Sequence, residues 1–330
     1  MKLAVIGAGA WGTALAVTLS ANYSVSLWSR RASHAADLRR DDENKKYLPG
    51  IHLGGAVQVV DEIESALQSA GLVLFAVPTA GLRDTLRLAR DYMAEAGGVW
   101  VCKGFEPGTG KLPHEVAAEE LLPATRRGVL SGPSFAADVA RGLPTAVTLA
   151  APDEEFAVTT ARRLHTGRFR VYSSTDLIGV EVGGAVKNVI AIAAGICDGL
   201  QLGDSARAAL VTRGLAEITR LGVRLGGRME TFMGLSGLGD LTLTCAGDLS
   251  RNRRVGLALA AGKRLPEILS ELGHVAEGVH TADEVLRLAD QLGVEMPITQ
   301  VVAKVLAGSV SPAAAVEALL HRDPKPESVA

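Results

Sequence analysis

The chain has 330 residues, of which 48% are hydrophobic, 21% charged and 4% aromatic. This length suits two domains, and the composition is that of an ordinary globular protein. A formal net charge of −2 gives no broad attraction to nucleic acid or to anionic membranes, so we expect neither partner and only local anion sites.

The first half of the chain alternates short apolar runs with amphipathic segments. Near-continuous apolar strands that alternate with helices are typical of a parallel sheet covered on both faces. We therefore expect an α/β class, with a Rossmann-like doubly wound parallel sheet over residues 1–175. Strands are predicted at residues 2–6, 25–28, 57–59, 72–77, 99–102, 129–131, 146–149 and 169–172, and helices at residues 10–21, 81–92 and 153–164.

From residue 175 onward the pattern changes to long helical segments without a convincing strand. This predicts an all-α substrate-binding and catalytic domain over residues 176–330, packed tightly on the first domain over a shared cleft. Glycine-rich loops are expected at residues 226–227 and 237–239, and a frayed tail from His321. The helices are predicted at residues 179–200, 206–221, 252–261, 282–291 and 299–307.

The cysteines and the apolar N-terminus indicate the compartment. The three cysteines lie far apart without metal-ligand spacing, which predicts no disulfide framework and no metal site, and favours a reducing cytoplasm. The apolar N-terminus is interrupted by glycines and lacks a cleavage site of the signal-peptide type. No stretch is expected to approach an uninterrupted transmembrane length. The cysteines are Cys102, Cys197 and Cys245.

Residues 7–12 form a G-x-G-x-x-G run that directly follows the first predicted strand and opens the first predicted helix. Gly7 suits the tight turn, Gly9 the close approach of backbone to a pyrophosphate, and Gly12 the close packing of helix on strand. The helix N-terminus presents free N–H groups and a positive dipole end to phosphates. The motif alone could be only a turn, but its position favours dinucleotide binding.

The second strand ends at Ser29, Arg30 and Arg31 without a carboxylate. An NAD enzyme usually places Asp or Glu there for the ribose 2′-hydroxyl, whereas Arg accommodates the 2′-phosphate of NADP. The two arginines therefore favour NADP(H), with use of NAD(H) left open. The alternative is that both are solvated arginines at a helix start.

Lys187 is the best candidate for a proton donor and acceptor. It lies in GGAVKNVIAIAAG, where it and Asn188 interrupt an apolar helical run. Burial of an ammonium lowers its pKa toward the working range, as proton exchange with an alcohol requires. The alternative is a lysine whose stem packs while its amine reaches water.

Two further segments follow predicted strands at the sheet edge where open α/β sheets bind ligands. Lys103 follows one strand and could hydrogen-bond a carbonyl or hydroxyl oxygen, although a plain strand-end charge explains it equally well. Residues 131–136, Ser-Gly-Pro-Ser-Phe-Ala, follow another strand and suit a ligand loop or an ordinary turn.

A basic cluster at residues 250–254, Ser-Arg-Asn-Arg-Arg, follows Asp240 at a short distance in the sequence. Ser250 suits an N-cap, which would give a helix start bearing guanidinium groups, a favourable phosphate site. A phosphorylated substrate then fits better than a plain hydroxy acid. The alternatives are a solvated basic helix end or an incidental nucleic-acid contact. Asp240 could orient Lys187, bind a substrate hydroxyl or cap a helix.

Together these segments resemble the bacterial-type NAD(P)-dependent glycerol-3-phosphate dehydrogenases. The resemblance runs in order from residue 7 to about residue 300 and implies an enzyme that reduces dihydroxyacetone phosphate to sn-glycerol 3-phosphate, or runs the reverse. It also implies a cytoplasmic homodimer that supplies glycerophospholipid synthesis. The matching segments are GAGAWGTALA, VCKGFE, SGPSFA, GLPTAV, EVGGAVKNVIAIAAGICDG, TRGLAEITRLG, FMGLSGLGDLTLTC, SRNRR, VAEGVHT and GVEMPIT.

The resemblance also implies roles for individual residues. Lys187 would be the general acid and base and would contact the substrate. One departure is Ala10, where many relatives carry serine, so a hydroxyl contact to the cofactor would be replaced by backbone. The substrate would further contact Lys103, Gly132, Ser134, Asp240, Ser250, Arg251 and Asn252. With the glycines of the motif (Gly7, Gly9, Gly12), the cofactor would contact Ala10, Trp11, Arg30, Arg31, Lys103, Ala136, Arg251, Val275 and Glu277.

Two other functions compete with this one. A β-hydroxyacid dehydrogenase also combines a Rossmann domain, a helical domain and a lysine, but carries a Ser-Gly-Gly loop for the substrate carboxylate, whereas residues 131–134 here read Ser-Gly-Pro-Ser. A cofactor-sensing regulatory protein without turnover would leave Lys187 idle or would read DNA with a basic helix. The arginines of residues 250–254 stand nearly alone as a basic cluster, which argues against DNA binding. An assay with dihydroxyacetone phosphate and NADPH separates all three.

Overall fold

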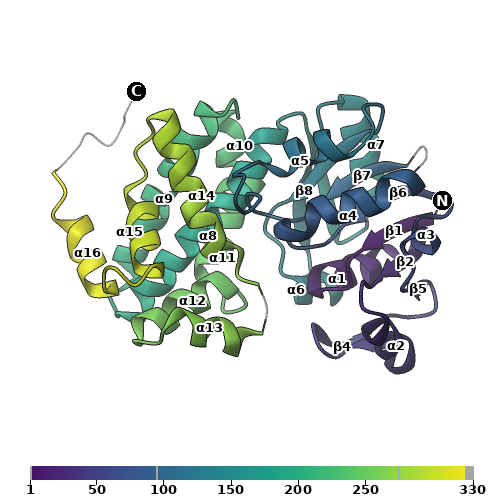
Figure 1. The fold of residues 1–330 in the computed structure, drawn as a ribbon, viewed down its shortest axis with the longest axis horizontal. Coiled ribbons are helices and arrows are strands. Elements are labelled where there is room, and N and C mark those ends of the chain that lie inside the picture. The colour runs from purple at the N-terminus through teal and green to yellow at the C-terminus, as the bar shows by residue number, and fades with distance from the viewer. Residues whose placement is uncertain (1, 94–95, 274, 324–330) are drawn as a thin grey trace.

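The structure, a computed structural model, describes residues 2–93, 96–273 and 275–323. An eight-stranded sheet with flanking helices forms one side of the molecule, and a group of helices forms the other (Figure 1). The expected class, a Rossmann-like sheet followed by helices, is confirmed. The domain limits 1–175 and 176–330 stay a prediction, and residues 324–330, with most of the tail expected to be frayed, lie outside the described residues.

All eight strands predicted from apolar runs are present in the large sheet, whose order is β10-β9-β8-β7-β6-β1-β2-β5. A two-stranded hairpin, β3 (Glu43–Asn44) and β4 (Leu48–His52), was not predicted. The strands of the large sheet are β1 (Lys2–Ile6), β2 (Ser24–Trp28), β5 (Val57–Val60), β6 (Ala70–Phe75), β7 (Gly97–Trp100), β8 (Arg127–Ser131), β9 (Thr145–Ala150) and β10 (Phe169–Ser174).

One pair of strands departs from the parallel sheet that the sequence predicts. β1 pairs in parallel with β2 and with β6, so that Ile6 lies opposite both Trp28 and Phe75. β8 and β9, however, run antiparallel. The helix between them, α6 (Ala136–Ala140), has only five residues, and a parallel crossover usually needs a longer helix to lead the chain back. The prediction of a wholly parallel sheet was therefore wrong at this pair.

Helices cover both faces of the sheet, as a doubly wound fold requires. On β1, Leu3 and Val5 face one core with α1, α2 and α7, whereas Ala4 and Ile6 face a second core with α3, α4 and α5. These helices are α1 (Ala10–Leu19), α2 (Ala32–Asp41), α3 (Ile63–Leu67), α4 (Leu82–Ala89), α5 (Pro113–Glu120) and α7 (Glu154–Leu164), with short 3₁₀ turns at Thr79–Gly81 and Arg90–Tyr92.

The second half of the described chain is helical. The loop expected at residues 237–239 was wrong, because Leu235–Gly239 forms a π-helical turn, η3. Glycine makes this wide turn possible, since a Cβ on Gly237 would lie 2.1 Å from the Phe232 carbonyl oxygen. The helices are α8 (Leu177–Gly199), α9 (Asp204–Arg224), α10 (Met229–Met233), α11 (Asp240–Ala246), α12 (Arg251–Ala260), α13 (Leu265–Leu272), α14 (Glu277–Leu292), α15 (Pro297–Leu306) and α16 (Pro312–Leu320).

Helix α8 is the centre of the helical part. It is 23 residues long with a mean hydropathy of 1.6 over its most apolar window, so the expectation that no stretch approaches a membrane-spanning length was wrong by length and composition. The other helices pack around it, however, and 94% of that window is buried inside the protein. A helix that is apolar all round is also what the centre of a large helical core requires.

The backbones of helices α12 and α8 nearly touch where the two helices cross. A Cβ on Gly195 of α8 would lie 2.0 Å from the Arg253 carbonyl oxygen, and a Cβ on Gly256 of α12 would lie 2.0 Å from that of Ile192. Only glycine fits at both positions. The crossing therefore brings the start of α12 beside the polar residues of α8.

Candidate active site

The G-x-G-x-x-G turn joins β1 to α1 and leaves a space for a phosphate group. Gly7 has a φ of +119°, and a Cβ there would lie 2.5 Å from the Ala76 carbonyl oxygen. A Cβ on Gly12 would lie 1.9 Å from the Gly7 carbonyl oxygen, whereas one on Gly9 would meet nothing within 4 Å. Gly9 is also the N-cap of α1 and places no side chain over its N–H groups. The turn therefore fits the pyrophosphate of a dinucleotide.

The other residues predicted to contact the cofactor lie on several elements. Ala10 begins α1, and the Trp11 ring packs edge-on against Phe169 with centroids 6.4 Å apart. Arg30 and Arg31 are exposed after β2, and their guanidinium groups form no ion pair within the described part of the chain. Their side chains are therefore free to meet a ligand. Ala136 begins α6, which packs against α1.

Lys187 and Lys103 meet on one carboxylate. Lys187, only 5% exposed, donates from Nζ to Asp240 Oδ1 at 2.5 Å and to Thr244 Oγ1 at 2.7 Å. Lys103 Nζ donates to Asp240 Oδ2 at 2.6 Å and to the Gly132 carbonyl oxygen at 2.9 Å. Three elements distant in the sequence thus place two amines and one carboxylate together.

Burial sets the protonation chemistry of Lys187. Loss of hydration lowers the pKa of its amine from 10.5 to about 8, the Asp240 carboxylate acts in the opposite direction, and the Lys103 charge adds to the lowering. An amine with a pKa near 8 can both give and take a proton near neutral pH. The predicted burial of Lys187 is confirmed, and its role in proton exchange stays a prediction.

The loops after β7 and β8 supply the rest of this wall. Lys103 follows β7, and Gly132 follows β8 with a φ of +141°, where a Cβ would lie 2.9 Å from Val147 Cα. Ser134 Oγ donates to the Gly132 carbonyl oxygen at 3.0 Å. Both loops lie at the carboxyl edge of their strands, where the sequence predicts ligand contacts.

A chain of amides connects four elements behind the lysines. Asn188 Nδ2 donates to the Lys103 carbonyl oxygen at 3.2 Å, and Asn252 Nδ2 donates to Asn188 Oδ1 at 2.9 Å. The Gly278 N–H in turn donates to Asn252 Oδ1 at 3.0 Å. The sequence reasoning gave Asn188 no role, and it missed Thr244. Two signals could have identified them: a polar residue inside an apolar helix, and a hydroxyl four residues after Asp240.

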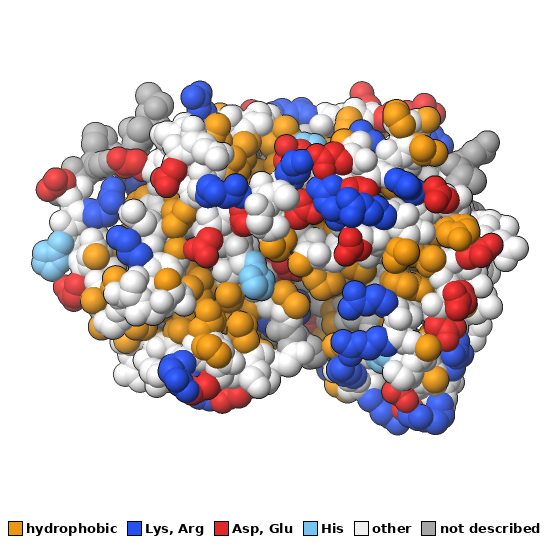
Figure 2. Space-filling model, viewed as in Figure 1, with side chains coloured by type: hydrophobic (Ala, Val, Ile, Leu, Met, Phe, Trp, Pro, Cys, Tyr) orange, Lys and Arg blue, Asp and Glu red, His pale blue; other side chains and the backbone are white. Residues whose placement is uncertain are grey.

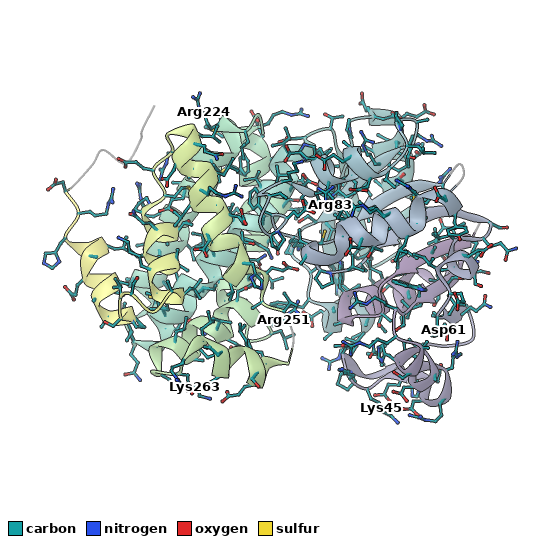
Figure 3. All side chains as sticks on the ribbon, in the orientation of Figure 1. Lys45, Asp61, Arg83, Arg224, Arg251 and Lys263 are labelled. Atoms are coloured by element: carbon teal, nitrogen blue, oxygen red, sulfur yellow. The ribbon has the colours of Figure 1, made fainter. Side chains whose placement is uncertain are left out.

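The side chains of the basic cluster at residues 250–254 have different surroundings in the structure. Ser250 is the N-cap of α12, as predicted, because its Oγ accepts from the Arg253 N–H. Arg253 pairs with Asp198 at 2.7 Å and with Asp248 at 2.9 Å, so it is occupied. Arg251 is exposed and lies where the helical part of the molecule faces the sheet side (Figure 3), next to the notch that the surface shows between the two sides (Figure 2). Surrounding protein nevertheless lowers its pKa by desolvation, against the charge of Glu277.

The start of α14 contacts the sheet side of the molecule. Glu277 Oε1 accepts from the Thr79 N–H at 3.2 Å, and burial raises the pKa of its carboxyl while Arg251 opposes that change. Val275 is 41% exposed just before the helix. No pattern in the sequence singled out these two residues, which came only from the family resemblance. Whether they contact a cofactor stays a prediction.

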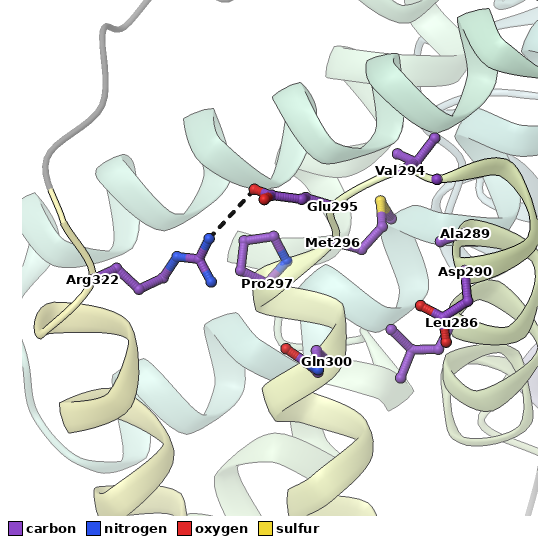
Figure 4. A pocket seen from close by; sticks show the side chains of 10 residues that line it. Leu286, Ala289, Asp290, Val294, Glu295, Met296, Pro297, Gln300 and Arg322 are labelled. Atoms are coloured by element: carbon purple, nitrogen blue, oxygen red, sulfur yellow. Dashed lines mark hydrogen bonds and ion pairs between the residues drawn. The ribbon is translucent and has the colours of Figure 1, made fainter.

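Elsewhere, the described residues offer little that resembles a second centre. No group of three or more His, Cys, Asp or Glu side chains in them could hold a metal ion. A hollow of about 380 Å³ lies between α14 and α15 (Figure 4), where Arg322 and Glu295 pair at 3.5 Å. None of its lining residues is a predicted site residue, so we assign it no part in the chemistry.

A dinucleotide turn on a Rossmann-like sheet, combined with a buried lysine of lowered pKa on the adjoining helices, defines a nicotinamide-dependent dehydrogenase. The profiles described as NAD-dependent glycerol-3-phosphate dehydrogenase N-terminus and C-terminus match residues 2–157 and 176–317. The chain belongs to this family. The predicted family, enzyme class and nicotinamide cofactor are therefore confirmed.

Individual relatives agree with this assignment. Glycerol-3-phosphate dehydrogenases (NAD(P)+) of Nitrosospira multiformis and Dechloromonas aromatica are 59% and 58% identical, each over 99% of both chains. The crystal structure of glycerol-3-phosphate dehydrogenase from Coxiella burnetii superposes with a TM-score of 0.93 at 41% identity, covering 97% of this chain and 99% of that chain. A ketopantoate reductase from Ralstonia eutropha, at 16% identity and a TM-score of 0.60, shares the fold alone.

Proposed function

We propose that this protein interconverts dihydroxyacetone phosphate and sn-glycerol 3-phosphate with NAD(P)H, and that Lys187 exchanges the proton. The observation that carries the proposal is the shared carboxylate: Asp240 holds the amines of Lys187 and Lys103 at 2.5 and 2.6 Å. The names of its relatives, glycerol-3-phosphate dehydrogenases, support this substrate pair.

Bound NAD(P)H supplies the hydride for the ketone carbon. Lys187 Nζ gives a proton to the oxygen at that carbon during reduction and takes it back during oxidation. Asp240 and Thr244 hold the amine in either protonation state, because a neutral amine keeps two N–H groups that can donate to them. Lys103, whose Nζ lies on the other oxygen of Asp240, stabilises the negative charge that develops on the same substrate oxygen.

The phosphate of the substrate binds at the start of α12 in this proposal. Arg251 offers a planar fork that matches phosphate oxygens, and Ser250 and Asn252 lie beside the N-terminus of the helix, where anions are favoured. Gly132 and Ser134 complete the substrate site from the loop after β8. Binding energy from the remote phosphate then orients the ketone toward Lys187.

The G-x-G-x-x-G turn would hold the cofactor together with Ala10, Trp11 and Ala136, and Val275 and Glu277 would contact it from the start of α14. Arg30 and Arg31, exposed and without ion-pair partners in the described chain, are available for the 2′-phosphate of NADP(H). We therefore propose a preference for NADPH over NADH.

We further propose a homodimer in the cytoplasm whose sn-glycerol 3-phosphate feeds glycerophospholipid synthesis. Exposed apolar side chains on adjacent helices, Val223, Met229 and Met233, supply surface that a second copy could cover. The cysteines, all free thiols, suit a reducing compartment. Sedimentation equilibrium of the purified protein tests the dimer, and cell fractionation tests the compartment.

The reaction itself is tested by NADPH oxidation with three substrates: dihydroxyacetone phosphate, dihydroxyacetone, and the oxidised form of a β-hydroxyacid. We expect turnover of the first, a much lower kcat/KM for the second because Arg251 then has no phosphate to bind, and none of the third. Equal kcat/KM values for the phosphorylated and unphosphorylated ketones would contradict the substrate assignment.

A further inference from the structure

The segment that carries Lys103 lies between the two halves of the molecule. We call residues 103–112, between β7 and α5, the Lys103 strap. Although it leaves the sheet, Phe105 and Leu112 are 2% and 4% exposed within the core of the helical part. Gly104 is also tightly enclosed, since a Cβ there would lie 3.0 Å from Thr79 Oγ1. The strap is thus built into both sides of the molecule.

A partly buried ion pair fixes the strap to α4. Glu106, 9% exposed, receives both arms of the Arg83 guanidinium: Nε donates to Oε1 at 2.7 Å and Nη2 to Oε2 at 2.8 Å. Thr109 Oγ1 donates to Oε2 at 2.6 Å. The arginine holds the pKa of the Glu106 carboxyl below its usual range. A two-armed contact of this kind fixes orientation as well as distance.

The opposite side of the strap is tied to α14, where the Gly108 N–H donates to Glu284 Oε1 at 2.6 Å. At its beginning, the Lys103 carbonyl oxygen accepts from Asn188 of α8. The pair of Glu106 and Arg83 lies between these two ties and connects the strap to the sheet side of the molecule (Arg83 is labelled in Figure 3).

We propose that Glu106 is a positioning residue for Lys103: its contact with Arg83 holds the strap so that Lys103 Nζ reaches Asp240 and the substrate oxygen. Glu106 follows Lys103 by three residues, so any shift of its backbone is passed to the lysine within one short segment. This inference rests on the proposed role of Lys103. No group of Glu106 itself touches substrate or cofactor in the proposal.

The same arginine offers a matched control. Arg83 Nη1 also donates to Glu120 Oε1 at 2.5 Å, and Arg87 Nε donates to Glu120 Oε2 at 2.8 Å. Glu120 lies at the end of α5, outside the strap, and is similarly buried at 7%. Glu120→Gln therefore disturbs the same charge network without releasing the strap, which separates positioning of Lys103 from stability in general.

The test is a double-mutant cycle on the full chain, with kcat/KM for dihydroxyacetone phosphate, the dissociation constant of NADPH and the melting temperature as readouts. We expect Glu106→Gln to lower kcat/KM about tenfold, since a small misplacement of a positioning group has effects of this size or larger. The dissociation constant of NADPH should change much less than kcat/KM, because the other cofactor contacts stay in place. Glu120→Gln should lower the melting temperature similarly and leave kcat/KM near wild type. In a Lys103→Met background, Glu106→Gln should have no further effect.

An equal loss in the Lys103→Met background, or equal effects of Glu106→Gln and Glu120→Gln on kcat/KM, would overturn the positioning role. Should Glu106→Gln fail to fold, Arg83→Lys keeps the charge but loses the fork, and the same cycle applies to it. If Lys103→Met alone retains wild-type kcat/KM, the proposed role of Lys103 is wrong, and the inference about Glu106 is wrong with it. If Lys103→Met loses activity, the role of Lys103 holds and the cycle tests Glu106 alone.

Discussion

Replacing Asp240 by Asn should move the pH dependence of the reaction, because one buried carboxylate holds the amines of both lysines. Asp240 is 1% exposed, so solvent cannot compensate for the loss of its charge. Asn keeps the shape of the side chain but removes the negative charge that raises the pKa of Lys187. The ammonium of Lys187 then becomes less favourable, and its pKa falls further.

The size of the effect follows from the surroundings of Lys187. With a pKa of about 8, roughly nine tenths of the amines carry a proton at pH 7. Loss of an opposite charge in contact shifts a pKa by about 1–3 units. A shift of about two units leaves roughly one tenth protonated, so protonation alone lowers kcat/KM for reduction about tenfold at pH 7. Stability should fall by about 3 kcal/mol, the lower end for a broken buried pair, because Lys187 can become neutral.

The assay is the pH profile of kcat/KM for dihydroxyacetone phosphate, which reports the pKa values of the free enzyme. Wild type should lose activity above about pH 8, and Asp240→Asn should lose it at a pH lower by one unit or more. Thr244→Val, which removes a neutral acceptor at 2.7 Å from the same amine, is the control and should shift the profile less. The same alkaline limb in Asp240→Asn and wild type would refute the reasoning.

Two further predictions concern Lys187 and Arg251. Because the pKa of Lys187 is lowered in the folded chain, the unfolded chain binds more protons between about pH 8 and 10.5, so its contribution to stability should rise with pH there by about 3 kcal/mol. Urea unfolding of wild type and Lys187→Met across this range checks the sign, and a falling difference would contradict it. Arg251→Lys should raise KM for dihydroxyacetone phosphate about 10–100-fold, since it loses a charge-assisted fork. Its kcat/KM for unphosphorylated dihydroxyacetone should fall far less, and an equal loss with both ketones would reject phosphate binding.

Local features were predictable because they depend on neighbouring residues. The G-x-G-x-x-G turn, the strand before it and the helix after it are encoded within residues 2–19, and the apolar run around Lys187 indicates burial by itself. The N-cap of Ser250 was equally local. The family resemblance added residues such as Glu277, whose partner Thr79 lies 198 residues away, which no local pattern can indicate.

Other features depend on packing between distant segments. The pairing of Asp240 with Lys187 and Lys103 joins residues 53 and 137 positions apart, and it requires the π-turn that was expected to be a plain loop. Arg253 looked equivalent to Arg251 in the sequence, but in the structure its guanidinium pairs with Asp198 of α8. The antiparallel pairing of β8 and β9 likewise depends on the short helix between them.

The central claim is that the amine of Lys187 transfers the proton at the ketone oxygen, and Lys187→Met tests it most directly because methionine keeps the apolar stem without the amine. Its turnover of dihydroxyacetone phosphate at saturating NADPH should fall by about 10²–10⁴-fold, the usual contribution of a general acid, with an unchanged dissociation constant for NADPH. Turnover within about threefold of wild type, well above that range, would contradict the account.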